Sequence, residues 1–158
     1  MPIEFTRIDD RFIHAQIVWG WTPIIKPTQI IIANDATASN ENLKKIFLMA
    51  GDQIKENVKI KILSLKDAVI DTSLNEKDQE RVFLILGSPK DALFLVKNKV
   101  NIKKISLGCI SECSGKRRIL ETVSVDDEDI KAIKELIEMG VEIEYQSTLS
   151  DKPVNISS

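Results

Sequence analysis

Short apolar runs alternate with amphipathic stretches along nearly the whole length of this 158-residue chain. The runs at 29–33 and 82–86 consist almost wholly of apolar residues, which is typical of parallel strands that are covered on both faces. The run at 58–63 alternates apolar and polar residues with the period of two that a strand produces. Together with similar runs, these patterns predict strands over residues 3–8, 29–33, 58–63, 82–86, 104–108 and 141–145.

The stretches between these strands carry apolar residues three and four positions apart, as the buried face of a helix requires. Pro23 and Pro27 are expected to end the first helix, and Gly51 to stop the second. Ser88 can cap a later helix with Pro89 at its first position, where no backbone N–H is needed. The predicted helices cover residues 14–21 and 39–50, a short segment from Ser64 to about residue 72, and the segments that follow Ser88 and Asp126.

This alternation of strands and helices, with no linker and no internal repeat, predicts one α/β domain over residues 1–158. Its central sheet is expected to be mainly parallel and doubly wound, with about six to seven strands, a mixed edge and helices on both faces. Residues 109–123 are expected to form a long irregular or hairpin connection. Residues 75–80 have the composition of a polar turn, and the tail from Asp151 is expected to be loosely ordered.

The composition is that of a globular protein, with 43% apolar and 29% charged residues. A formal charge of −2 gives no electrostatic reason to expect binding to nucleic acid or to an anionic membrane surface. No apolar run approaches the ~18 residues that span a bilayer, and the first residues lack the pattern of a secretory signal. We therefore expect a cytoplasmic protein that reaches a membrane only through partners. The spacing of Cys109 and Cys113 fits neither a redox pair nor a zinc site, so both are interpreted as free thiols.

The only histidine, His14, lies where the first predicted strand gives way to the first helix. In an open α/β sheet the carboxyl ends of the parallel strands share one edge, and ligands bind there. A histidine at this edge is a stronger candidate for function than one on an arbitrary helix face, although it could also be an ordinary polar residue at a helix start. Asp35 and Ser88 follow other predicted strands and are expected to lie on the same rim.

Several kinds of site are disfavoured by what the sequence lacks. A metal site would need further histidine or cysteine ligands beside Asp9 and Asp10, and no second histidine exists. The chain has neither the G-x-S-x-G motif of a hydrolase nor the glycine-rich loops that bind dinucleotides or nucleotide phosphates. The remaining option is that His14 itself is a nucleophile, which accepts a phosphoryl group on a ring nitrogen.

The residues around His14 suit a phosphoryl group. Arg7 and Arg11 can offer forked donors to phosphate oxygens, and the start of a helix offers free backbone N–H groups. Asp10 can hydrogen-bond one ring nitrogen of His14 and so decide which nitrogen is free to attack. Other interpretations stay open, because Arg7 could be a plain salt-bridge partner of a nearby carboxylate and Asp10 could cap the first helix.

Residues 7–16, RIDDRFIHAQ, closely resemble the signature RIDDRLIHGQ of a family of bacterial proteins. This family comprises the IIB components of the mannose/fructose/sorbose class of the phosphoenolpyruvate-dependent sugar phosphotransferase system. Trp21 falls where the family has a tryptophan, so the resemblance extends beyond the signature. Three further segments resemble other motifs of the family in the same order: SPKD at 88–91, ISLG at 105–108 followed by GK at 115–116, and VSVD at 123–126.

The resemblance implies a single α/β domain that acts as a phosphoryl carrier and transferase. His14 would take a phosphoryl group on Nδ1 from a phosphohistidine of the IIA protein or domain. It would then give that group to a sugar carried by the membrane IIC and IID subunits. Arg11 and Asp10 would contact the phosphate and orient His14, with Arg7 as a further candidate. No metal or organic cofactor is implied, the subunit could form a homodimer, and the sequence does not reveal the sugar.

Docking to two different partners suggests further candidates. Phe12 is expected to be an exposed apolar anchor, although it could instead be a satellite core contact. Lys116, with two arginines after it, could attract a phosphorylated partner or lie at a solvated hairpin tip. Ala15 and Cys109 stand where the family pattern has glycines and put the fine geometry of the active-site loop in question. The alternative interpretation of the whole chain is a regulatory or small-molecule-binding relative without sugar phosphotransfer.

Overall fold

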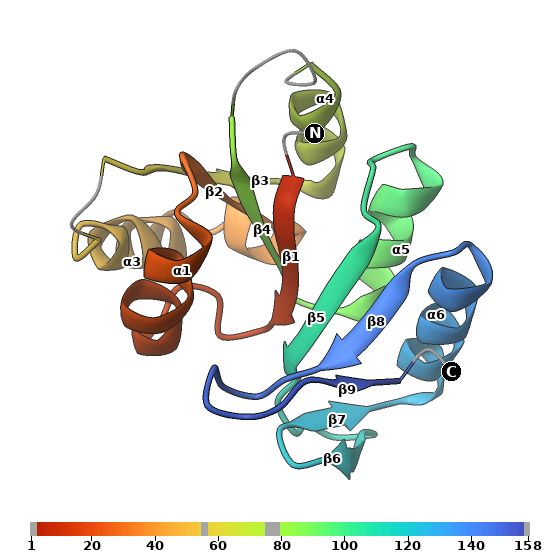
Figure 1. Ribbon diagram of the computed structural model, residues 1–158. Helices are drawn as coiled ribbons and strands as arrows, with labels where there is room; N and C mark the ends of the chain where they lie inside the picture. Colours follow the sequence, from red (N-terminus) through yellow and green to blue (C-terminus); the bar gives the residue numbers. More distant parts are fainter. Residues whose placement is uncertain (1–2, 55–56, 75–79, 157–158) are drawn as a thin grey trace.

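The computed structural model describes residues 3–54, 57–74 and 80–156, and its centre is a seven-stranded sheet (Figure 1). The strands are β1 (Ile3–Asp9), β2 (Gln29–Ala33), β3 (Lys59–Leu63), β4 (Val82–Leu86), β5 (Lys104–Cys109), β8 (Glu142–Tyr145) and β9 (Val154–Asn155). Their order is β3-β2-β4-β1-β5-β8-β9, and every neighbouring pair is parallel except β8 and β9. The predicted mainly parallel α/β fold is confirmed.

Helices cover both faces of this sheet (Figure 1). The helical segments are η1 (Gln16–Trp21), α1 (Thr22–Ile25), α2 (Asp35–Ala38), α3 (Glu41–Gly51), α4 (Leu65–Leu74), α5 (Pro89–Lys97) and α6 (Asp127–Glu138). One core cluster joins the sheet to η1, α1 and α3, and the other joins it to α4, α5 and α6. The sheet is therefore doubly wound, as predicted.

The apolar runs that predicted the central strands supply both cores. Every residue of β2 and β4 is buried. In β2, Ile30 and Ile32 belong to the core under η1 and α3, whereas Ile31 belongs to the core under α4 and α5. Phe83 and Leu84 divide in the same way in β4, because successive side chains of a strand point to opposite faces. A strand covered on both faces needs apolar residues at both sets of positions.

Two of the helix starts read from the sequence are also confirmed. The Ser88 side chain accepts a hydrogen bond from the Asp91 backbone N–H at 3.2 Å, and Pro89 opens α5. Asp126 and Asp129 form a reciprocal capping box at the start of α6, with N–H to carboxylate distances of 2.8 and 3.1 Å. These caps satisfy backbone donors that a helix leaves without partners.

Of the two prolines expected to end the first helix, Pro27 follows its end, but Pro23 does not end it. Residues 16–21 form a π-helix, η1, which continues directly into α1, and Pro23 lies within the first turn of α1. A proline fits there because the first helical turn does not need its N–H. The chain leaves the helix at Lys26, whose φ of 51° is left-handed, and Pro27 follows.

The second helix matches the prediction, whereas the chain end differs from it. Residues 39–50 were expected to form one helix, and α3 covers Glu41–Gly51, with Asn40 capping it through the Leu43 N–H at 3.1 Å. The short helix α2 before it was not predicted. The tail after Asp151 is ordered as β9, which pairs antiparallel with β8 and makes the mixed edge of the sheet. The expected hairpin after β5 is the separate two-stranded sheet of β6 (Arg117–Leu120) and β7 (Val123–Val125). Most of the predicted polar turn, residues 75–79, lies outside the described residues.

Strand β1 lies in the middle of the sheet, between β4 and β5. The chain leaves β1 toward the face that carries η1, whereas it leaves β4 toward α5 on the opposite face (Figure 1). Neighbouring strands whose connections diverge in this way open a crevice at their carboxyl ends, where α/β proteins place their ligands. The segment from Asp9 to His14 is therefore at the position that the topology favours for a site. None of the helices in the described ranges combines the length and apolar character needed to cross a bilayer.

Candidate active site

The site centres on a hydrogen-bonded pair, His14 and Asp9. Asp9 is the last residue of β1 and its side chain is fully buried, whereas the His14 side chain is 18% exposed. The Phe12 N–H donates to the Asp9 carbonyl at 3.0 Å, and this turn brings His14 back over the end of the strand. His14 Nε2 then lies 3.1 Å from Asp9 Oδ2.

The state of the Asp9 carboxyl fixes the tautomer of His14. Burial raises the pKa of Asp9, but the hydrogen bonds from His14 and Arg11 outweigh it and bring the pKa down to about 2. An ionised carboxylate can only accept a hydrogen bond, so Nε2 of His14 carries the proton. The neutral ring therefore has its lone pair on Nδ1, and no residue in the described ranges forms a hydrogen bond with that nitrogen.

Arg11 lies at the surface side of the same carboxylate. Its Nε and Nη2 each lie 3.0 Å from one oxygen of Asp9, which is the forked geometry of a guanidinium–carboxylate pair. The hydrogen bond to Asp9 raises the pKa of Arg11, and 41% of its side chain is exposed. Arg11 can therefore hold Asp9 and still present positive charge to an anion beside His14.

The prediction that Arg7 contacts phosphate is wrong, because the Arg7 side chain is fully buried. Its Nη1 donates to Ser106 Oγ at 3.1 Å, its Nε lies 3.5 Å from Asp9 Oδ2, and burial lowers its pKa. The alternative interpretation, in which Arg7 is a salt-bridge partner of a nearby carboxylate, agrees with the structure. That carboxylate belongs to Asp9. The alternation along β1 explains this result, since it points Phe5, Arg7 and Asp9 to the face that η1 covers.

Asp10 does not orient His14 as predicted, since Asp9 makes that contact. The Asp10 carboxylate instead accepts from the Ser111 N–H at 2.7 Å and from the Ser111 hydroxyl at 2.9 Å. It ties the loop after β1 to the loop after β5. Sequence reasoning missed Asp9 because the two aspartates are adjacent. The period of two along β1 distinguishes them, since only Asp9 points to the face of the sheet that the following helix covers.

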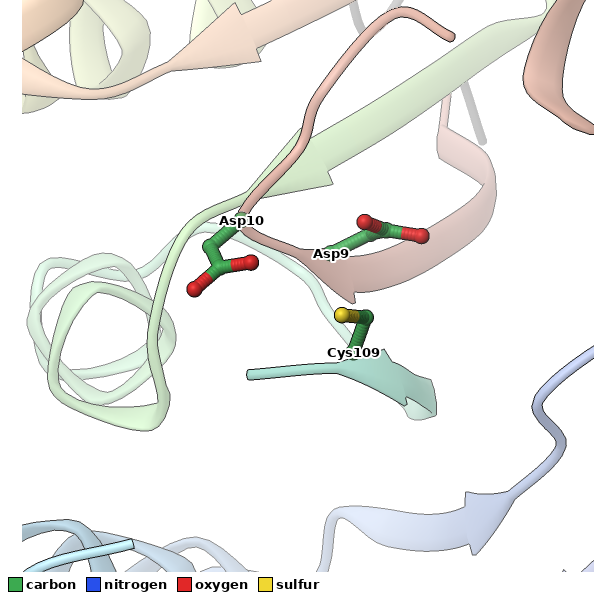
Figure 2. A group of neighbouring side chains, drawn as sticks. All are labelled: Asp9, Asp10 and Cys109. Atoms are coloured by element: carbon green, nitrogen blue, oxygen red, sulfur yellow. The ribbon is translucent and has the colours of Figure 1, made fainter. Parts of the chain in front are cut away.

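Asp9, Asp10 and Cys109 come together at the ends of β1 and β5 (Figure 2), with one possible ligand atom from each within 4.8 Å of the others. Both oxygens of Asp9 already bind cationic or N–H donors, and both oxygens of Asp10 bind Ser111. Burial also raises the pKa of the Cys109 thiol, which disfavours the thiolate that metals bind. The partners of these three groups explain their positions without a metal ion.

Phe12 is not the exposed anchor that was expected, because it is only 8% exposed. Its ring packs edge-on against Phe47 of α3, with centroids 5.7 Å apart, and lies in the core under η1. Its backbone is left-handed, with φ of 57°, which is unusual for a residue with a bulky side chain. The core contact turns the loop so that polar residues, rather than Phe12, face the solvent.

The two departures from the family pattern have different surroundings. Ala15 has ordinary helical dihedrals, φ −54° and ψ −42°, so its position does not need a glycine. Cys109 is half-buried at the end of β5, and its carbonyl accepts the Asp10 N–H at 3.1 Å.

The other rim candidates lie on different loops. Asp35 is exposed after β2, and its Oδ1 accepts the Leu65 N–H at 2.9 Å at the start of α4. Ser88 caps α5 after β4. Lys116 lies before β6 and forms an ion pair with Asp129 at 3.5 Å, with 19% of its side chain exposed. Their contacts are structural, and the docking roles of these three residues stay predictions.

The doubly wound α/β fold of this chain is also found in solved structures of other proteins. The crystal structure of the IIBSor domain of the sorbose permease from Klebsiella pneumoniae matches this structure with a TM-score of 0.92. The two are 32% identical in sequence, and the match covers 99% of this chain and 94% of that one.

Sequence comparisons identify the family. The family described as "PTS system sorbose subfamily IIB component" matches residues 3–158. The sorbose-specific EIIB component of Klebsiella pneumoniae is 32% identical over 156 residues, which cover 99% of this chain and 93% of that protein. The mannose-specific EIIAB component of Escherichia coli strain K12 is 29% identical over 151 residues, which are 96% of this chain but 46% of that longer protein. The chain therefore belongs to the sorbose subfamily of IIB components of the sugar phosphotransferase system, whose members act as phosphotransferases in sugar transport.

Proposed function

We propose that this protein carries phosphate on Nδ1 of His14. The donor is the phosphohistidine of a IIA protein or domain, and the acceptor is a sugar held by membrane IIC and IID subunits. Membership of the IIB family supports this route of phosphoryl transfer to a sugar. The fused EIIAB relative supports IIA as the phosphoryl donor. The observation that carries the choice of atom is the hydrogen bond between His14 Nε2 and Asp9 Oδ2, which leaves Nδ1 as the nucleophile.

The transfer itself needs little from the protein beyond position and charge. The Nδ1 lone pair of His14 attacks the phosphorus atom, while the N–P bond of the donor breaks and its electron pair returns to the donor imidazole. The phosphorylated ring of His14 then carries positive charge shared with Nε2–H. The Asp9 carboxylate, ionised above a pKa of about 2, offsets that charge through its hydrogen bond.

Arg11 is the residue that we assign to the phosphoryl oxygens. Its Nε and Nη2 donate to Asp9, Nη2 also donates to Gln16 Oε1 at 3.4 Å, and 41% of the side chain is exposed. A fixed guanidinium beside the reacting phosphorus stabilises the charge that the three oxygens carry during transfer. Because Asp9 offsets part of the positive charge of Arg11, the site can bind phosphate without holding it too tightly to be passed on.

The test is phosphorylation by the IIA partner after it has been charged from phosphoenolpyruvate, followed by mapping of the acid-labile phosphate. We expect one phosphohistidine per chain, at His14 and on Nδ1, and we expect the His14→Gln variant to take up none. Uptake of phosphate by folded His14→Gln would contradict the site. The same phosphorylated protein, added to membranes that contain its IIC and IID subunits, is expected to lose its phosphate to the sugar. Retention of phosphate there would favour the regulatory alternative.

A further inference from the structure

Arg7 is a charged group near the site that is buried too deeply to reach a ligand. Its side chain is fully buried, and Nη1 and Nη2 donate to the carbonyl oxygens of Gln146 and Ser147, each at 2.8 Å. Nη1 also bonds Ser106 Oγ of β5 at 3.1 Å. These partners lie about one hundred or more positions away in the chain, so Arg7 fastens the loop after β8 to the centre of the sheet.

The same guanidinium contacts both parts of the chain that set the position of His14. Its Nε lies 3.5 Å from Asp9 Oδ2, the oxygen that accepts from His14. Its Cζ lies 4.6 Å from the ring centre of Trp21, which is buried in η1, the helix that follows His14. Arg7 therefore fixes the carboxylate at the end of β1 against the helix that follows His14.

Gly108 leaves the space that this guanidinium occupies. A Cβ atom added at Gly108 would lie less than 3.0 Å from three Arg7 atoms, Nη2, Cζ and Nε. Real Cβ atoms essentially never come so close, so the guanidinium would have to move. Because Nη1 and Nη2 already donate to three neighbours, that movement would break hydrogen bonds inside the protein.

We propose that Arg7 is a positioning residue for phosphoryl transfer. It holds Asp9 and η1 in the relative position that keeps the His14 proton on Nε2. This inference rests on the proposed function only for its consequence, since the tautomer can be measured without a phosphate donor. The role requires an arginine, because a planar fork can donate in two directions and stack on an aromatic ring at the same time. A lysine ammonium at this depth would keep the charge and lose that geometry.

The experiment uses the fact that the chain contains one histidine. Nitrogen-15 labelling of histidine gives the imidazole signals of His14 alone, and their chemical shifts report the tautomer near pH 8. We expect the wild-type protein to be almost wholly the Nε2–H form. In Arg7→Leu we expect a several-fold larger fraction of the Nδ1–H form and a rate of phosphate uptake from the phosphorylated IIA partner lower by roughly 10–100-fold.

Arg81→Leu is the matched control. Arg81 also bonds two backbone carbonyls, those of Lys26 and Ile25, through Nε and Nη2. No contact with the Asp9–His14 pair is found for it. We expect this variant to change the melting temperature without changing the tautomer or the rate of uptake. A tautomer shift in both variants would assign the effect to general loosening and contradict the specific role of Arg7.

A double-mutant cycle with Gly108→Ala tests the same geometry without removing a charged residue. Alone, Gly108→Ala is expected to shift the tautomer as Arg7→Leu does, because its Cβ displaces the guanidinium. In the Arg7→Leu background it is expected to add nothing, since no guanidinium is left to displace. Equal effects of Gly108→Ala in the two backgrounds would overturn the proposal.

Three further outcomes decide between the role of Arg7 and the proposed function. If Arg7→Leu does not fold, Arg7→Lys is the milder variant, and a wild-type tautomer in that variant would contradict the need for the fork. If the wild-type protein takes no phosphate on His14, the proposed function fails while the tautomer measurement still decides the role of Arg7. A wild-type tautomer and rate in folded Arg7→Leu would overturn the inference and leave the function intact.

Discussion

Asp9 and Asp129 are two fully buried carboxylates whose different partners give them different roles. Asp9 has hydrogen bonds to both oxygens and lies near the cationic groups of Arg7 and Arg11 as well as the imidazole of His14. Asp129 uses Oδ2 for the Asp126 N–H and for Lys116, and its Oδ1 has no hydrogen-bond partner among the described residues. The first carboxylate orients a titratable ring that solvent can reach, whereas the second completes the capping box at the start of α6. Burial of an acid therefore does not identify a catalytic group, and the identity of its partners does.

Among the variants that test this comparison, Asp9→Asn is expected to have the largest effect on the rate of phosphate uptake. Asn keeps the size of the side chain but has one acceptor oxygen and no charge. His14 therefore loses the carboxylate charge that fixes its tautomer. We expect the rate of phosphate uptake from the phosphorylated IIA partner to fall by about 10²–10⁴-fold. The measurement is a single-turnover assay with the folded variant.

Asp10→Asn is the adjacent control for that variant. The Asp10 carboxylate bonds only Ser111 among the described residues, so we expect the uptake rate of this variant to stay within about threefold of wild type. A loss for Asp10→Asn as large as that for Asp9→Asn would return the orienting role to Asp10.

A smaller effect is expected for Arg11→Gln. Without the guanidinium, the oxygens of the transferring group lose a charged donor, and we expect the uptake rate to fall by roughly 10–100-fold at all salt concentrations. Arg117→Gln, at an exposed position of β6, changes only the long-range electrostatic field. We expect it to alter the apparent affinity for the phosphorylated partner at low salt and to have no effect near 0.5 M salt. A salt-dependent loss for Arg11→Gln would place Arg11 in docking rather than in transfer.

Acid unfolding measures how much the ionisation of Asp9 contributes to the free energy of unfolding. The pKa of Asp9 in the folded protein, about 2, lies below its usual value of 3.8, so its ionisation stabilises the fold above about pH 4. That contribution, about 2 kcal/mol at most, is lost as the pH falls through 2. We expect the pH dependence of the unfolding free energy of Asp9→Asn to lack this component. Denaturant titrations of both proteins between pH 2 and pH 6 measure it, and parallel curves would contradict the low pKa.

The smallest effect is expected for Asp129→Asn. The variant keeps an oxygen for the Asp126 N–H but loses the charge that faces Lys116, so we expect the unfolding free energy to fall by about 1 kcal/mol. The rate of phosphate uptake and the His14 tautomer should not change. A loss of uptake in this variant would mean that the two buried carboxylates are coupled, and the comparison would fail.

The sequence by itself determined the order of strands and helices, the doubly wound fold and the place of His14 at the end of the first strand. These follow from patterns within a few residues of one another, such as the apolar runs of β2 and β4 and the Ser88 cap of α5. It also carried the family signature, which the comparisons confirmed. Its errors in the fold fell where packing overrides a local signal, at Pro23 within α1 and at the tail that joins β8 as β9.

Only the tertiary structure decided which charged neighbour of His14 does what. Adjacent aspartates and nearby arginines have the same chemistry in a sequence, and their roles separate only when the direction of each side chain is known. Asp9 turns toward His14, Asp10 toward Ser111, and Arg7 away from solvent to residues about 100 and 140 positions further on. Contacts over such separations depend on how strands and loops meet, which no local pattern contains.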